Sequence, residues 1–207
     1  GPRYRLRIAC PKAAQAAARE AAPRAEMIAA PRDTGRAWQA GLTAAEEAYI
    51  VFLQAGDILR PFALLNWIEA ALASDADMTV SQYRIGTAPD ALPHDGFVDP
   101  RVLAATPGTG PLPMRPAVAL ALAPEIGNRL FRRAFLLEQG LVFTPGPRPG
   151  WALGLGAALL ARQVAYVGWT GVALARVDRG RQRGGQVGRA HRRLLRALPD
   201  PATHALP

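Results

Sequence analysis

Hydrophobic and polar positions follow two alternating periods along the first half of the chain. Short apolar or alternating runs of the kind found in β-strands are separated by stretches in which apolar residues recur at helical spacing. The predicted strands are residues 4–10, 26–29, 49–53 and 77–85. The predicted helices are residues 12–21, which Pro11 opens, residues 34–47, which Thr34 caps, and a helix that begins at Pro61. This alternation is typical of a sheet covered by helices.

The second half continues the pattern after an interruption. Residues 86–116 contain seven prolines and are expected to form a long surface excursion. Beyond them come an apolar run and two short predicted helices, and then two predicted closing strands; these are residues 117–122, 132–139, 151–162, 164–167 and 172–177. The predicted fold class is α/β, with a Rossmann-like, mostly parallel central sheet and helices on both faces.

Length and charge divide the chain into two parts. The 207 residues are 50% hydrophobic, which fits one domain with an extension and argues against global disorder. The formal charge of +9 is concentrated at the end, because residues 176–207 hold eight arginines against two aspartates, a net +6. We therefore expect a domain over residues 3–178 and a basic extension over residues 179–207.

The extension combines arginines with leucines on one helical face. Its candidate contact residues for an anionic surface are Arg189, Arg192, Arg193 and Arg196. A basic amphipathic segment suits anionic lipid, so a cytoplasmic protein at the inner face of the cell membrane is one expectation. A solvated or oligomer-contacting tail and nonspecific nucleic-acid binding are the alternatives. The chain has no motif for sequence-specific nucleic-acid recognition.

Cysteine and histidine are scarce in this chain. Cys10 is the single cysteine, and the three histidines lie in separate segments, which excludes a multi-cysteine zinc site. His94 and Asp95 are adjacent in the proline-rich excursion and are candidates for a general base and its partner. Solvated loop residues are the alternative interpretation of this pair.

Two stretches resemble family 2 glycosyltransferases of the GT-A fold. The first contains the helix segment AGL, the strand YIVFL at residues 49–53 and the strand ADMTV at residues 76–80. The second contains GNRLFRRAFL at residues 127–136, similar to the family's NKLFRRSFL, followed by GLVF. The resemblance implies transfer of a sugar, with inversion, from a nucleotide sugar to a cell-surface glycan or a lipid-linked acceptor.

The resemblance also places candidate site residues. The family's acidic loop after the YIxFL strand holds Mg²⁺ or Mn²⁺ on the donor diphosphate, and here that loop contains Gln54 and Asp57. Trp38 and Gln39 stand where the family has a donor-binding dipeptide, and Trp151 is a candidate for contact with a sugar ring. Packing roles for both tryptophans and a helix-capping role for Asp57 are the alternatives.

The sequence departs from the family at these same positions. Asp57 is the only carboxylate of its loop, and residues 145–151 contain none where the family carries its general base. Binding without a metal, or without any cofactor, is therefore as strong an expectation as binding with one. The chain also lacks room for the family's first β–α unit. The alternative function is a non-catalytic module that binds a glycan or a partner chain, or that belongs to a larger parent protein.

Overall fold

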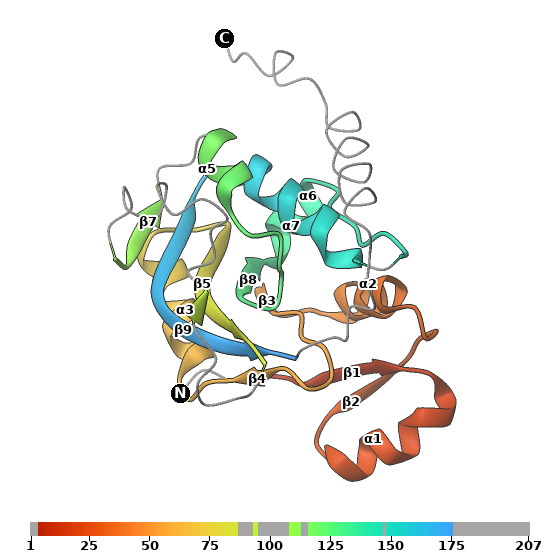
Figure 1. Ribbon diagram of the computed structural model, residues 1–207. Coiled ribbons are helices and arrows are strands. Elements are labelled where there is room, and N and C mark those ends of the chain that lie inside the picture. The colour runs from red at the N-terminus through yellow and green to blue at the C-terminus, as the bar shows by residue number, and fades with distance from the viewer. Residues whose placement is uncertain (1–3, 87–92, 95–107, 113–115, 147, 176–207) are drawn as a thin grey trace. The chain divides into compact units, whose positions relative to one another are not determined.

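The computed structural model describes residues 4–86, 93–94, 108–112, 116–146 and 148–175, without the side chains of residues 93–94 and 116–117 (Figure 1). The chain divides into two units, Gly1–Ala175 and Arg176–Pro207, and every described residue belongs to the first. Asp95 and the four arginines of the predicted extension lie outside the described residues. The predicted domain boundary at residue 178 lies outside them too.

Residues 4–30, called the N-terminal unit below, are a part of the first division of the chain and form one strand–helix–strand motif. Strand β1 (Arg7–Cys10) and strand β2 (Glu26–Ala29) form a parallel two-stranded sheet, and they are joined by the 3-10 turn η1 (Lys12–Ala14) and helix α1 (Gln15–Ala21). The strands and the helix predicted for this segment are confirmed. Pro11 precedes the turn, as expected of a residue whose fixed φ suits the start of a helix.

A second, seven-stranded sheet carries most of the fold. Its order is β3-β8-β5-β9-β4, with β6 beside β5 and β7 beside β9. These strands are β3 (Tyr49–Ile50), β4 (Ile58–Leu59), β5 (Met78–Ile85), β6 (Pro93–His94), β7 (Gly110–Leu112), β8 (Arg129–Arg132) and β9 (Val164–Leu174). Strands β6 and β7 lie within the segment that was predicted to be a surface excursion.

The strand directions correct the expectation of a mostly parallel central sheet. In the seven-stranded sheet, β5 and β9 are parallel, whereas β8 runs antiparallel to both β3 and β5, and β4, β6 and β7 are antiparallel to their partners. An unbroken apolar run indicates a strand buried on both faces, which antiparallel strands also show when helices cover both sides. The pattern therefore predicted the burial of the strands and left their direction open.

Helices cover both faces of this sheet, as predicted for the α/β class (Figure 1). Helix α3 (Ala63–Ala73) packs on β5 and β9 and places the fully buried Trp67 at the centre of one core cluster. The other cluster joins apolar residues of four helices: α2 (Thr34–Ala44), α5 (Pro116–Ala121), α6 (Arg133–Glu138) and α7 (Pro149–Leu160). Among the described residues, no helix is long and apolar enough to cross a membrane.

The two closing strands predicted at residues 164–167 and 172–177 form a single strand in the structure. Strand β9 runs unbroken through Gly168 and Gly171, and its register with β5 shifts around Gln82. Gly171 lies directly against the indole of Trp67, where an added Cβ would come within 2.5 Å of a ring carbon. Glycine ordinarily signals a break in a strand, but at this position the missing side chain leaves room for a tryptophan.

Candidate functional site

The turn from Gln54 to Asp57 follows strand β3 and is built mainly by its own hydrogen bonds. The Asp57 N–H donates to the Gln54 carbonyl over 3.0 Å, and the Gln54 N–H donates to Asp57 Oδ2 over 2.8 Å. Gly56 sits at φ 96°, a left-handed conformation that a residue with a side chain rarely adopts. The turn is thus held in one conformation, with the Gln54 side chain exposed to solvent.

The second carboxylate oxygen of Asp57 ties this turn to the end of strand β9. Asp57 Oδ1 accepts a hydrogen bond of 2.7 Å from the N–H of Ala175, immediately after β9. Gly127 lies close by, since a Cβ added there would be 3.5 Å from Asp57 Oδ2. The carboxylate therefore joins two segments that are 118 residues apart in the sequence.

The oxygen ligands available at Asp57 suit a divalent cation poorly. Mg²⁺ and Mn²⁺ favour several hard oxygen ligands, and both oxygens of Asp57 already accept backbone N–H groups. Within the described part of the chain, there is no group of three or more His, Cys, Asp or Glu side chains that could hold a metal. The geometry supports a fold-stabilising role for Asp57, and its role as a metal ligand stays a prediction.

Trp38 and Gln39, on helix α2, contact the segment after β3 and the segment after α6. The indole N–H of Trp38 donates to the Leu53 carbonyl over 3.2 Å, and its ring lies 5.3 Å from that of Phe143. Gln39 Oε1 accepts a 3.0 Å hydrogen bond from the N–H of Phe143. Helix α2 therefore fixes the residue just before Gln54, while both side chains remain half-buried.

Trp151 lies in the first turn of α7 and stacks on an arginine. The guanidinium carbon of Arg148 is 3.8 Å from the centre of the Trp151 ring, which covers one face of the indole. The start of α7 adjoins the start of α2, because a Cβ on Gly35 would collide with the Thr144 carbonyl oxygen and come within 2.8 Å of Pro149 Cβ. Helix α2 thus contacts both the residue before Gln54 and the start of the helix that carries Trp151.

His94 lies on none of the helices or turns that carry these residues. It is in β6, where its Cα is opposite Tyr83 of β5. Its proposed partner Asp95 is outside the described residues. The role of this pair as a catalytic base therefore stays a prediction.

Arg129 is a buried charged residue that the sequence interpretation missed. Its Nη1 donates to the Gly154 carbonyl over 2.5 Å and its Nη2 donates to the Ala123 carbonyl, so the side chain joins α7 to the segment before β8. Complete burial lowers the pKa of Arg129 to about 10. The available signal was its place in the GNRLFRR stretch, between residues that pack in the core.

Comparison with solved structures finds similar folds at low sequence identity. No family model and no curated protein sequence matches the chain. Structures of S. aureus TarS 1–349 match with a TM-score of 0.62 at 12% identity for the protein alone, and 0.61 at 11% identity for its complex with UDP-GlcNAc. The match covers 82% of this chain but about half of the TarS 1–349 chain. TarS is a glycosyltransferase, and the present chain has a similar α/β fold.

Proposed function

We propose that this chain is a glycosyltransferase-like domain that binds a nucleotide sugar beside the Gln54–Asp57 turn. The observation that carries the proposal is the structural similarity to TarS over most of the chain, together with TarS structures that hold UDP-GlcNAc and UDP. The turn is closed by its own hydrogen bonds, is exposed over residues 54–56 and is bound to the end of β9, while α2 binds Leu53 just before it. Uridine nucleotides are therefore the first donors to test.

The contacts in the turn suggest different roles for its two polar residues. Asp57 keeps the turn in place, since both its oxygens bind backbone N–H groups. The exposed Gln54 amide offers a donor and an acceptor, which suits the hydroxyls of a ribose or a sugar. Trp151 would stack on a sugar ring with the face that Arg148 leaves uncovered. Binding of the nucleotide is then expected without a metal.

If the domain transfers sugar, the reaction is an inverting displacement. The hydroxyl oxygen of a glycan or lipid-linked acceptor would form a bond to the anomeric carbon, the bond to the nucleoside diphosphate would break, and the hydroxyl proton would be released. The arginines of residues 176–207 would bind anionic lipid and so keep the chain at the membrane surface, where a lipid-linked acceptor lies. Asp57 is unsuited as the base for the acceptor proton because its oxygens are engaged by backbone donors.

A non-catalytic binding module is the second candidate, and the engagement of Asp57 favours it. A carboxylate whose two oxygens both accept backbone N–H groups is poorly suited to take the acceptor proton, a step that a binding module does not need. Such a module would recognise a nucleotide sugar or a glycan without turning it over.

Calorimetric titration of the full chain with UDP, UDP-GlcNAc and GDP, in EDTA and in Mn²⁺, separates these possibilities. We expect a uridine nucleotide to bind equally in both buffers, and Gln54→Ala to weaken it about tenfold, the loss of one hydrogen bond to a polar group. Glu69→Gln, on the exposed side of α3, is the matched control and should bind normally. Binding without hydrolysis or transfer would favour the module, and absence of binding by all three nucleotides would contradict the donor site.

A further inference from the structure

Two large apolar side chains are exposed where strand β4 leads into helix α3. Ile58 lies on β4, at the end of the strand order of the seven-stranded sheet, and is 51% exposed. Phe62 immediately precedes α3 and is 74% exposed. Arg60 and Pro61 between them are exposed as well, and neither apolar side chain belongs to a core cluster. Residues 58–62 are called the edge segment below.

Phe62 has a backbone conformation that is unfavourable for a large side chain. Its φ is 66°, in the left-handed region, where glycine and asparagine are favoured and a bulky residue is an outlier. Hydrogen bonds on both sides fix this conformation. The Ala63 N–H donates to the Arg60 carbonyl over 3.1 Å, and the Asn66 N–H donates to the Phe62 carbonyl over 3.0 Å. Neither core packing nor backbone preference calls for phenylalanine here, which points to a function of the side chain outside the fold.

The edge segment directly follows the Gln54–Asp57 turn and is held by the same strand. Ile58 pairs with β9, and the Arg60 N–H donates to a carbonyl of that strand over 2.9 Å. Asp57, one residue before Ile58, binds the N–H of Ala175 at the end of β9. The exposed apolar side chains are therefore fixed beside the proposed donor site.

The charges near the edge segment favour an anionic partner. Arg60 is exposed in its middle, and Asp57 is the only acidic residue between positions 54 and 68. The chain continues from Ala175 into residues 176–207, which hold eight arginines against two aspartates, a net charge of +6. Exposed apolar side chains combined with arginine form a surface that suits anionic lipid.

The small size of the apolar surface favours lipid over a protein partner. A stable protein interface buries about 800 Å² on each partner. The edge segment offers two large apolar side chains and a proline. Membrane binding requires less area, because a small apolar insertion adds to the attraction of basic residues for anionic lipid.

We propose that Ile58 and Phe62 insert into the surface of an anionic bilayer, with the Arg60 guanidinium at the lipid phosphates. Contact with the bilayer does not require a nucleotide. It rests on the proposed function only for its consequence, namely that a lipid-linked acceptor would lie beside the Gln54–Asp57 turn.

Flotation of the full chain with vesicles of phosphatidylglycerol and phosphatidylcholine in equal parts, without nucleotide, tests this contact. Phe62→Asn should weaken binding about tenfold, because it removes an inserted aromatic ring. Asparagine tolerates the left-handed backbone, so this variant should be at least as stable to urea as the unsubstituted chain. Ile58→Thr, which keeps a β-branched residue on the strand, should weaken binding by a similar factor.

Leu72→Gln is the matched control. Leu72 is 64% exposed on α3, about 15 Å along the helix from Phe62, and its substitution should leave vesicle binding unchanged. A second measurement uses chains in which Cys10→Ser removes the single cysteine. A fluorescent probe on Phe62→Cys should be quenched by lipids that carry nitroxide groups on their acyl chains, whereas the same probe on Leu72→Cys should not.

Several results would overturn the proposed contact. Full vesicle binding by both Phe62→Asn and Ile58→Thr would assign binding to residues 176–207 alone. A probe at position 62 that is not quenched, or a chain that does not bind the vesicles, would show that the edge segment stays in water. A dimer in sedimentation experiments that Phe62→Asn dissociates would make a second copy of the chain the partner. Absence of nucleotide binding, in contrast, would contradict the donor site and leave these results unaffected.

Discussion

The seven-stranded sheet and the N-terminal unit are stabilised in different ways. The sheet lies between two clusters of buried apolar side chains, and residues such as Trp67, Val80 and Phe131 are fully inaccessible. The N-terminal unit contributes no residue to either cluster, and none of the residues of η1 and α1 is buried. Packing of α2 and ion pairs at the strand starts hold it instead. Burial of apolar area stabilises far more than partly exposed ion pairs do, so the two regions should differ in stability.

Truncation of the central aromatic residue of the sheet should have the largest effect. Trp67 is fully buried between α3, β5 and β9. Trp67→Ala would leave a large cavity, and we expect the free energy of unfolding to fall by about 3–5 kcal/mol. Urea unfolding followed by circular dichroism measures this loss. A change below about 1 kcal/mol would mean that the core is not centred on α3.

A smaller but still substantial loss of stability is expected at Gly171, where the sheet has no space for a side chain. The Cβ of Gly171→Ala would meet the rigid Trp67 ring, which cannot move away, so we expect a loss of about 1–3 kcal/mol. Gly41→Ala is the matched control because a Cβ added at this position of helix α2 meets nothing within 4 Å. That control should raise stability by about 0.5–1 kcal/mol. Equal effects of the two variants would contradict the tight contact.

An apolar truncation in the N-terminal unit should cost less than either core change. Ile8 is half-buried on β1, so Ile8→Ala is expected to lower the free energy of unfolding by about 1 kcal/mol or less. Native-state hydrogen exchange should show the loss mainly in β1 and β2, with β5 unchanged. A loss as large as that of Trp67→Ala would show that the two regions unfold as one.

The smallest effect should be local and dependent on pH. The Arg7 guanidinium holds the pKa of Glu47 at about 2, below its ordinary value of 4.5. A depressed carboxyl pKa stabilises the fold above about pH 4.5, and this contribution disappears as the pH falls toward about 2. Exchange protection of β1 should therefore decline across that range.

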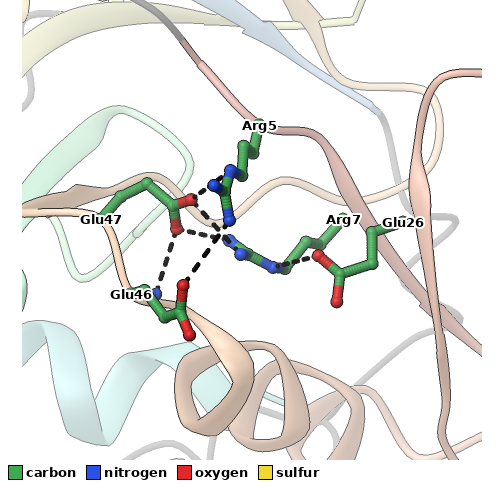
Figure 2. Close-up of polar contacts among 5 residues, drawn as sticks. All are labelled: Arg5, Arg7, Glu26, Glu46 and Glu47. Atoms are coloured by element: carbon green, nitrogen blue, oxygen red, sulfur yellow. Dashed lines mark hydrogen bonds and ion pairs between the residues drawn. The ribbon is translucent and has the colours of Figure 1, made fainter.

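Glu47→Gln provides the control for this pH effect. The variant keeps the shape of the side chain but cannot titrate, so protection of β1 should be weaker at neutral pH and lack the step between about pH 4.5 and 2. An unchanged step would contradict its assignment to Glu47, whose contacts with Arg5 and Arg7 are drawn in Figure 2.

The candidate site shows which contacts can be predicted from the sequence and which cannot. Gln54 and Asp57 were singled out by the resemblance to family 2 glycosyltransferases, whose donor loop follows the YIxFL strand, and their shared turn is local in the sequence. The bond from Asp57 to Ala175 could not be foreseen, since it depends on how β9 passes the turn. Arg129 was missed for a similar reason: its partners are main-chain carbonyls of two other segments.

The sequence by itself determined the elements of this protein and the class of its fold. Helical spacing and apolar runs are local properties, so they located α1, α2, α3 and β2 closely and indicated a sheet covered on both faces. Strand direction, the single long β9 and the separation of β1 from β3 were decided only by the tertiary structure. These features depend on which strands form hydrogen bonds with one another, and hydrogen bonding between distant segments leaves no periodic signal in either partner.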